Sequence, residues 1–420
     1  MTDLTSNICQ IIIFDEQCNA SNYGVNTYVS QILDIFKNHV HIKLFHVVLF
    51  SSIKEVTFMR VNENTYMIKI PHYNGEKDEA HTIYFKNTIY LLRQYIDEKV
   101  HTIFHFNFLL TASFIDEIKE IFRSNLTVYT AHSILVPSGY KKISYKDDIS
   151  PKVKDQAIAE GIKIEKSFLL KIDRICCLSD ATKDFFYKVY EINESKLLKI
   201  KNGLKDRYKS IPQIEKKKIR EKYNFKEHKS KLILYVGRLD YFKGLSYLIE
   251  AFEIILTKNK DYYLIIVGDG DYNPFLKLRN NNWKNIIFTG KLPQEEVYNL
   301  YRICDIGILP SLSEQCSFVA IEMMMFQLPI IASNAEGLDE MFVDDDNALK
   351  IKIQDDLNEQ LSTKEISEKI TNLIHDKILM DKISRKARSF YLEQHILSKF
   401  KDNILSLYQI SKPFYGTMSN

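Results

Sequence analysis

The sequence has no apolar run long enough to cross a membrane. A membrane-spanning helix needs about 20 consecutive apolar residues, and the first apolar run, at residues 8–14, is much shorter. It is also shorter than the apolar core of a secretory signal with its flanks. We therefore expect a cytoplasmic protein without a transmembrane segment.

The chain also has little net charge and no cysteine pattern of a metal site. Its 57 basic and 54 acidic side chains leave a formal charge of +3, so composition gives no reason to expect nucleic acid as a partner. The six cysteines form no Cys-x-x-Cys pair and no zinc-type spacing with histidine. We expect mostly buried thiols, no metal ion and no bound cofactor.

Short β-branched segments alternate with helix-length amphipathic segments along most of the chain. This alternation predicts an α/β fold with doubly wound parallel sheets and helices on both faces. Two domains are expected, because the chain has 420 residues and a single core seldom exceeds about 250 residues. The predicted strands lie at 10–14, 41–50, 102–106, 127–132, 174–179, 232–236, 263–267, 286–289, 305–309 and 329–332, and predicted helices at 86–98, from 244 and from 317.

The alternation is interrupted once, by a lysine-rich segment at 205–231, and a new cycle starts at 232. We therefore predict a first Rossmann-like domain at 1–204 and a second at 205–388. The last segment, 389–420, contains an aromatic-rich helix at about 390–408. We expect this segment to cross back to the first domain.

In open α/β sheets, ligands bind at the carboxyl ends of the strands, and the loop after the strand at 232–236 carries two cations. Arg238 and Lys243 lie in Gly-Arg-Leu-Asp-Tyr-Phe-Lys-Gly, directly before a helix. Two positive side chains beside a helix N-terminus suit a nucleotide's diphosphate. An exposed arginine and lysine on an ordinary loop would look the same, so this loop alone leaves the question open.

A second loop, at 310–317, combines a carboxylate with a helix start. Glu314 lies in the loop and Glu322 in the second turn of the following helix, while Ser317 is a candidate N-cap. Ionised carboxylates bind sugar hydroxyls well, so Glu314 is a candidate for the transferred sugar and Glu322 for the ribose. Two surface glutamates at this spacing are also common.

The first half offers weaker candidates. Gly24 lies in the turn at 17–25, directly before a helix expected to begin near Val25. Backbone at this glycine could approach a phosphate or an acceptor, but Gly-x-Gly-x-x-Gly is absent. His132 follows a predicted strand, and its imidazole could donate a hydrogen bond to a ligand. An ordinary loop glycine and a structural histidine remain the alternatives.

Taken in order, these segments resemble the large retaining family of GT-B glycosyltransferases, family 4. The resemblance covers about residues 232–341 and is weaker in the first half. It rests on the following segments: 237–244, Val267-Gly268-Asp269-Gly270, Thr289-Gly290, Glu314 to Glu322, Leu328-Pro329 and 336–340, with Tyr23-Gly24-Val25, Thr130 to Ser133 and Asn202-Gly203 in the weaker half.

The resemblance implies a nucleoside-diphosphate sugar as donor, a hydroxyl acceptor bound by the first domain, and retention of the anomeric configuration. Arg238 and Lys243 would bind the diphosphate, and Glu314 the transferred sugar. The remaining donor contacts it implies are Gly24 in the glycine-loop position, Lys291 and Leu292 near the base, Cys316, Ser317 and Phe318 at the helix start, and Glu322 at the ribose. His132 matches the family's cleft histidine, which gives a catalytic set of Glu314, His132, Arg238 and Lys243.

Two departures from the family pattern leave alternatives open. Gln315-Cys316-Ser317 replaces the usual Gly-Phe-Gly, and bulky residues at 323–326 follow Glu322. A non-catalytic nucleotide-sugar-binding protein or a nucleotide-sugar epimerase on the same fold is therefore the alternative reading. A phosphorylase is disfavoured because no lysine signature for pyridoxal phosphate is found.

Metal dependence and membrane contact are two further questions. The Asp-x-Asp patterns at 269–271 and 344–346 resemble metal-binding motifs, but two cations already supply the charge a magnesium ion would bring, so we expect a metal-independent enzyme.

Tyr140, Lys141 and Lys142 allow at most weak peripheral membrane contact. The sequence assigns neither the sugar, the base, the acceptor nor the oligomeric state.

Overall fold

The structure is a computed structural model that describes residues 9–16, 23–72, 78–134, 151–223, 225, 230–278, 283–354 and 360–410. The chain forms two compact units. The first comprises Met1–Ile200 and Lys401–Asn420, and the second Lys201–Phe400. Within the described residues, no helix is both long and apolar enough to cross a bilayer.

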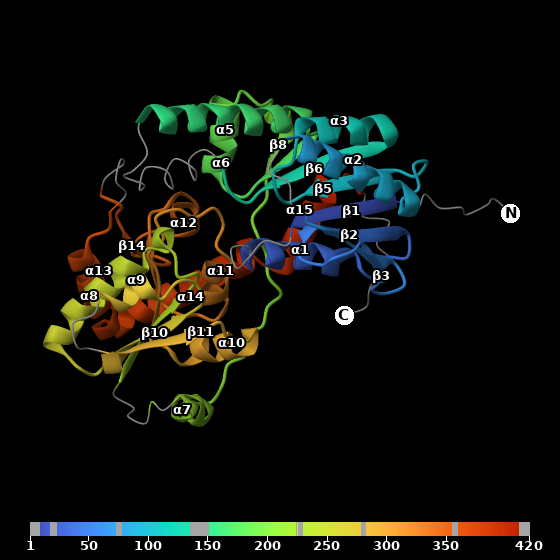
Figure 1. The fold of residues 1–420 in the computed structure, drawn as a ribbon. Helices are drawn as coiled ribbons and strands as arrows, with labels where there is room; N and C mark the ends of the chain where they lie inside the picture. The colour runs from blue at the N-terminus through green and yellow to red at the C-terminus, as the bar shows by residue number, and fades with distance from the viewer. Residues whose placement is uncertain are drawn as a thin grey trace. The chain divides into compact units, whose positions relative to one another are not determined.

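The first unit is built on an eight-stranded sheet, counted over the described residues, in the order β3-β4-β2-β1-β5-β6-β7-β8. Figure 1 shows these strands beside helices α2 and α3. The strands are β1 (Cys9–Glu16), β2 (Ile42–Ser51), β3 (Thr57–Arg60), β4 (Thr65–Pro71), β5 (Thr102–Phe106), β6 (Asn125–Ala131), β7 (Arg174–Cys177) and β8 (Leu197–Lys199). The helices are α1 (Tyr23–Phe36), α2 (Asp78–Tyr95), α3 (Ala112–Ile121), α5 (Pro151–Lys171) and α6 (Asp180–Lys188).

Strands β1 and β5 form the centre of this sheet and pair in parallel. Both are almost completely buried, as expected for strands that helices cover on both faces. The ring of Phe14 stacks on that of Phe106, with centroids 4.9 Å apart. The predicted parallel α/β architecture is therefore confirmed for this unit.

The edge of this sheet differs from the prediction, because β3 and β4 were not foreseen. β3 pairs antiparallel with β4, while β4 pairs in parallel with β2. β3 has no fully buried residue, and Phe58 and Met59 are exposed. A short edge strand with one solvated face lacks the continuous apolar run that identified the central strands.

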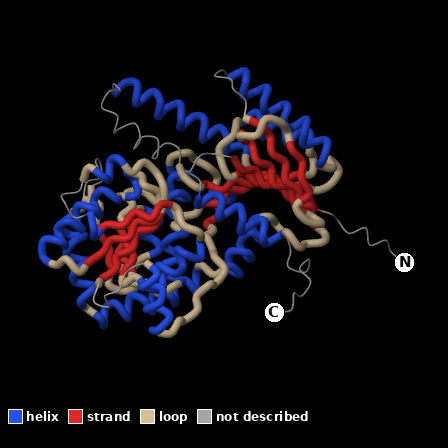
Figure 2. Tube along the Cα trace, turned by 60° about the horizontal axis from the view of Figure 1, so that its bottom comes forward, coloured by secondary structure: helices blue, strands red, loops and turns tan. Residues whose placement is uncertain are grey.

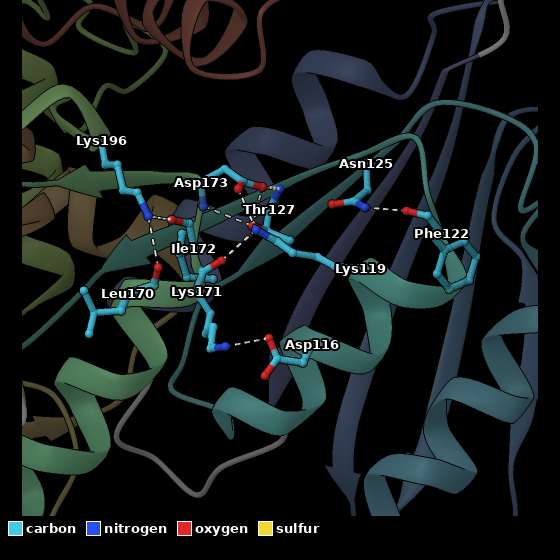
Figure 3. A network of polar contacts seen from close by, with 10 residues as sticks. All are labelled: Asp116, Lys119, Phe122, Asn125, Thr127, Leu170, Lys171, Ile172, Asp173 and Lys196. Atoms are coloured by element: carbon cyan, nitrogen blue, oxygen red, sulfur yellow. Dashed lines mark hydrogen bonds and ion pairs between the residues drawn. The ribbon is translucent and has the colours of Figure 1, made fainter. Parts of the chain in front are cut away.

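A polar network joins α3, the end of α5, β6 and β7 (Figure 3). Lys119 donates to Asp173 at 2.6 Å and to the carbonyl of Lys171 at 2.7 Å. The other carboxylate oxygen of Asp173 accepts from the backbone N–H and the hydroxyl of Thr127. Partial burial opposes ionisation of Asp173, but the hydrogen bonds from Lys119 and Thr127 outweigh it, so the pKa of this carboxyl is lowered. The ionised Asp173 thus links α3 to β6 through Lys119 and Thr127, and Lys119 also contacts the end of α5.

The second unit has a six-stranded parallel sheet in its described residues, in the order β11-β10-β9-β12-β13-β14. Figure 2 shows these strands with helices around them. The strands are β9 (Lys231–Val236), β10 (Tyr262–Val267), β11 (Ile286–Gly290), β12 (Ile306–Leu309), β13 (Ile330–Ser333) and β14 (Leu349–Ile351). The helices are α7 (Gln213–Lys222), α8 (Leu245–Lys258), α9 (Asn273–Leu276), α10 (Gln294–Ile303), α11 (Phe318–Met325), α12 (Glu336–Met341), α13 (Thr363–His375) and α14 (Lys377–Gln394).

Helix α8 confirms the amphipathic pattern read from the sequence. Its apolar stripe is completely or almost completely buried and packs in the core of the unit. This stripe consists of Leu245, Leu248, Ile249, Phe252, Ile255 and Leu256. Full burial of such side chains stabilises the fold by about 1.5–3 kcal/mol each.

The helix expected at 390–408 is not continuous, so that prediction was wrong in its extent. α14 ends at Gln394 and α15 (Leu397–Leu407) begins three residues later. The helix is interrupted because the backbone at 395–397 pairs with Leu204. Leu204 N–H donates to the carbonyl of His395, and Leu397 N–H donates to the carbonyl of Leu204. Buried His395 also contacts the carbonyl of Asn202 through Nδ1 at 2.8 Å.

Candidate functional site

The polar loops singled out in the sequence meet at the carboxyl edge of the second sheet. β9 lies between β10 and β12 in this parallel sheet, so the loops that follow these strands are neighbours. The loops after β9 and β12 were predicted to carry donor-binding residues, and the turn after β10 carries the Val-Gly-x-Gly motif. The structure shows how glycines bring the loops into direct contact.

The loop after β9 is shaped by Asp240 and Gly244. Asp240 caps the short 3₁₀ turn η2 (Tyr241–Lys243) by accepting from the N–H of Phe242 at 2.8 Å. Gly244 has φ of +66°, and a Cβ here would lie 1.8 Å from the carbonyl oxygen of Pro310. Only glycine combines this conformation with so close an approach. The loop after β9 is therefore pressed against the loop after β12.

The turn after β10 is packed against the other side of the same loop. The N–H of Leu239 donates to the carbonyl of Asp269 at 2.8 Å. Gly268 has φ of +139°, and a Cβ on it would lie 1.8 Å from the carbonyl oxygen of Gly237. The Val-Gly-x-Gly motif thus allows the backbone of this turn to pack closely against the loop that carries Arg238.

Lys243 and Glu314 form an ion pair between the loops after β9 and β12. The side chain of Lys243 is 21% exposed and that of Glu314 is 18% exposed, so the pair is largely but not completely buried. Arg238 is more exposed and lies 3.5 Å from the carboxylate of Asp240. The structure therefore brings Lys243 and Glu314 together and leaves Arg238 on the same loop with a weaker partner.

The backbone of Glu314 is held by the N-terminus of α12. The N–H of Gly337 donates to the carbonyl of Glu314 at 2.9 Å. A Cβ on Gly337 would lie 1.7 Å from the carbonyl oxygen of Gln315. Glycine is therefore required at position 337 by packing, because the backbone there lies directly against the loop that carries Glu314.

The start of α11 has the N-cap that the sequence predicts. The Ser317 hydroxyl accepts from the N–H of Ala320 at 3.3 Å. Cys316 is buried, and burial raises the pKa of its thiol to about 12. Its carbonyl accepts from Asn202 Nδ2 at 2.9 Å. Any contribution of Cys316 to a ligand would come through its backbone rather than a thiolate, while Phe318 is partly exposed.

Glu322 lies in the second turn of α11 without a basic partner among the ion pairs of the described residues. It accepts a hydrogen bond from the hydroxyl of Tyr301 at 2.8 Å. Burial raises its pKa to about 7, and the hydrogen bonds from Tyr301 and Gln294 oppose that rise. Hydrogen bonds from further hydroxyl groups would stabilise the ionised form of this buried carboxyl and so lower its pKa.

The last donor-side residues follow β11. The N–H of Gly268 donates to the carbonyl of Gly290 at 3.0 Å, which ties this strand end to the turn after β10. Lys291 is exposed and Leu292 partly exposed directly after it. Both therefore lie at the same sheet edge as Arg238.

In the first unit, His132 directly follows β6, and its neighbours include two residues that the sequence did not single out. His132 Nε2 lies 3.1 Å from Asn107 Oδ1, and its ring meets that of Tyr28 edge-on, with centroids 4.8 Å apart. Asn107 directly follows β5, the strand beside β6. Position at the end of a neighbouring strand was the one available signal for it.

The imidazole of His132 does not match the predicted donor to a ligand. Burial lowers its pKa to about 4, although the negative charge of Asp15 acts to raise it. The ring is therefore neutral at pH 7 and carries a single N–H. The Nε2 contact with Asn107 uses this donor inside the unit, so the expectation of a donor N–H is corrected.

Gly24 lies near the start of α1 and is exposed, and a Cβ there would meet nothing within 4 Å. Packing therefore does not require glycine at this position. The preceding residues 17–22 lie outside the described residues. The residues named for membrane contact, Tyr140, Lys141 and Lys142, lie outside them as well.

Within the described ranges, no group of three or more His, Cys, Asp or Glu side chains could hold a metal ion. The Asp-x-Asp segments have local roles. Asp271 accepts from the backbone N–H of Asn273 at 2.9 Å, and Asp344 from that of Lys350 at 2.7 Å. Asp346 lies 3.9 Å from Lys386.

The second unit also contains a cavity of about 270 Å³ away from these loops. Cys304, Asp305, Leu328 and Pro329 line it and directly precede β12 and β13. It therefore opens at the amino edge of the sheet, opposite Lys243 and Glu314. Tyr301 contributes to its wall and reaches Glu322 through its hydroxyl.

Comparison with solved structures identifies the class of fold. Sucrose-phosphate synthase from Thermosynechococcus elongatus superposes with a TM-score of 0.77 at 17% identity, covering 95% of this chain and 98% of that protein. Anabaena HepE, solved in complex with UDP-glucose, gives a TM-score of 0.70 at 15% identity, covering 95% and 99%. The chain has the GT-B fold, which confirms the predicted pair of Rossmann-like domains.

The comparison by sequence finds a family match in the second half of the chain. Residues 215–390 match the model of the family Glycosyl transferases group 1. Among curated relatives, alpha-D-kanosaminyltransferase of Streptomyces kanamyceticus is 21% identical over 253 residues, or 58% of this chain. The matched part spans 62% of that relative's length.

Proposed function

We propose that this protein is a retaining glycosyltransferase that moves a sugar from a nucleoside-diphosphate sugar to a hydroxyl acceptor. The observation that carries the proposal is the Lys243–Glu314 ion pair at the carboxyl edge of the second sheet. A diphosphate needs fixed positive charge, and a sugar needs a carboxylate that accepts from its hydroxyls. This pair offers both groups side by side on loops that glycines hold together.

Chemistry at this site would depend on charge that grows on the leaving diphosphate. As the glycosidic bond to phosphate breaks, Lys243 and Arg238 stabilise the developing negative charge, and the N-terminus of α11 adds its partial positive charge. The departing phosphate oxygen accepts the proton of the incoming hydroxyl on the same face of the sugar. That geometry retains the anomeric configuration and needs no protein side chain as general base.

The names of two similar proteins support a nucleotide-sugar donor. HepE was solved with UDP-glucose, and a UDP-Gal:alpha-D-GlcNAc-diphosphoundecaprenol alpha-1,3-galactosyltransferase of Escherichia coli is 31% identical over 170 residues. Glu322 supports the donor assignment as well, because its raised pKa and its lack of a basic partner among the described residues suit ribose hydroxyls. The acceptor and the identity of the sugar are left open.

A test is to incubate the protein with UDP-, GDP- and ADP-sugars, with and without EDTA, and to follow release of the nucleoside diphosphate. We expect release from one donor that survives EDTA and falls about 10- to 100-fold in Glu314→Gln, because a charge-assisted hydrogen bond to the sugar is weakened. Glu250→Gln, on an exposed face of α8, is the matched control. Tight donor binding without release, even with cell extract as the source of acceptor, would favour a non-catalytic binding protein.

A further inference from the structure

A chain of hydrogen bonds with fixed polarity runs from the backbone of β1 to His132. Asn107 Nδ2 donates to the carbonyl of Phe14 at 3.0 Å. A carbonyl oxygen only accepts, so the amide nitrogen must face Phe14 and the amide oxygen must face the imidazole. That oxygen also only accepts, so the nitrogen 3.1 Å away, His132 Nε2, carries the hydrogen. The backbone thus determines which ring nitrogen is protonated.

The charges around His132 leave the ring with one proton. Burial lowers its pKa to about 4, so the ring is neutral above that pH, while Asp15 at the end of β1 acts in the opposite direction. In the described part of the chain, two further ionisable groups beside His132 are neutral: burial lowers the pKa of His105 to about 3 and raises that of Tyr28 well above its usual value. With the proton on Nε2, Nδ1 keeps a lone pair.

The ring is also held from a second side. The hydroxyl of Tyr28, whose ring packs edge-on against His132, lies 2.9 Å from Thr130 Oγ1. Thr130 in turn contacts His105 Nε2 at 2.7 Å, and His105 Nδ1 contacts the hydroxyl of Tyr408 at 2.5 Å. All of these groups are buried. Asn107 therefore determines the tautomer of His132. The network of Tyr28, Thr130, His105 and Tyr408 determines the position of the Tyr28 ring, which packs against the imidazole.

We propose that Asn107 is a positioning residue that holds His132 as the Nε2–H tautomer, so that Nδ1 accepts a hydrogen bond from a hydroxyl group of the bound substrate. Nδ1 has no partner within the described part of the chain. An acceptor at this position suits a sugar hydroxyl and disfavours a phosphate or carbonyl oxygen, which would meet a lone pair. The inference about substrate rests on the proposed function, whereas the tautomer is a property of the free protein.

The tautomer can be measured without turnover. In ¹⁵N-labelled protein, long-range proton–nitrogen correlations distinguish Nε2–H, Nδ1–H and charged imidazoles, and the His132→Gln variant identifies the signals of His132. We expect the neutral Nε2–H pattern at pH 7. A neutral Nδ1–H pattern, or a charged ring at pH 7, would overturn the positioning role.

The variants Asn107→Asp and Asn107→Ala test the role of the amide. An aspartate keeps the shape but places a carboxylate beside Nε2, so we expect the pKa of His132 to rise and the acidic limb of kcat/KM to move to higher pH. In Asn107→Ala we expect a mixture of tautomers. We expect kcat/KM to fall about 10-fold, which corresponds to the free-energy contribution of one hydrogen bond. Both effects should be measured with the donor that the panel identifies.

Asn125→Asp is the matched control, because Asn125 also donates to a backbone carbonyl in the first unit but has no contact with His132. We expect it to leave the pH profile and the signals of His132 unchanged. The positioning role is contradicted if the Asn107→Asp variant folds but the protonation of His132 is unchanged in it. A shifted protonation with an unchanged pH profile supports that role and instead contradicts a substrate contact of His132.

Discussion

Replacing Lys243 with methionine should lower kcat/KM for the donor about 100- to 1000-fold, the usual effect of removing one group that stabilises transition-state charge. Methionine preserves much of the length and volume of the side chain while removing its charge. The loss should appear mainly in kcat, because the charge on the leaving diphosphate grows as the bond breaks. Steady-state kinetics of nucleoside diphosphate release measure it. Lys258→Met, at the last turn of α8, is the control and should retain activity.

A double variant separates this role from a purely structural ion pair. Lys243→Met alone leaves the largely buried carboxylate of Glu314 without its partner, which is costly in itself. If the pair only maintained the fold, Lys243→Met/Glu314→Gln would regain stability and activity together. We expect it to regain stability but to remain as inactive as the less active single variant.

Gly244→Ala should have the largest effect on stability among the site variants. A Cβ at this position would lie 1.8 Å from the carbonyl oxygen of Pro310, and the φ of +66° is unfavourable for alanine. We expect the free energy of unfolding to fall by about 2–4 kcal/mol and donor affinity to fall as well, because the loops after β9 and β12 must separate. Urea unfolding and donor titration measure the two effects.

Gly24→Ala provides the matched control for this substitution. Its Cβ would meet nothing within 4 Å, and Gly24 lies in helix α1, where alanine is favoured over glycine. We expect unchanged or slightly higher stability. Equal destabilisation by both substitutions would contradict the view that Gly244 is required by the contact between the two loops.

The buried strands could be predicted from the sequence because parallel strands under helices are continuously apolar. β5 and β10 were located to within one residue for this reason. β3, β8 and β14 were missed, since a short strand at the edge of a sheet buries too few side chains to produce such a run. β4, which pairs with β3, was missed as well. The break between α14 and α15 was missed as well, because it depends on pairing with Leu204, which is almost 200 residues away in sequence.

The candidate site shows a similar division. The order of motifs in the second half was enough to select Arg238, Lys243, Glu314 and Glu322, but spacing could not show that Lys243 and Glu314 form an ion pair. Asn107 gave no motif at all. Its relation to His132 arises only because β5 and β6 are neighbours in the sheet, so that both residues lie at the same strand ends.

The most direct measurement is a crystal structure of the protein with the nucleoside diphosphate of the donor that the panel identifies. We predict that the diphosphate contacts Lys243 Nζ and the guanidinium of Arg238, that Glu314 is released to face the sugar position, and that the ribose hydroxyls bond to Glu322. A nucleotide bound in the cavity at the amino edge of the sheet, with the Lys243–Glu314 pair intact, would contradict the proposed donor site.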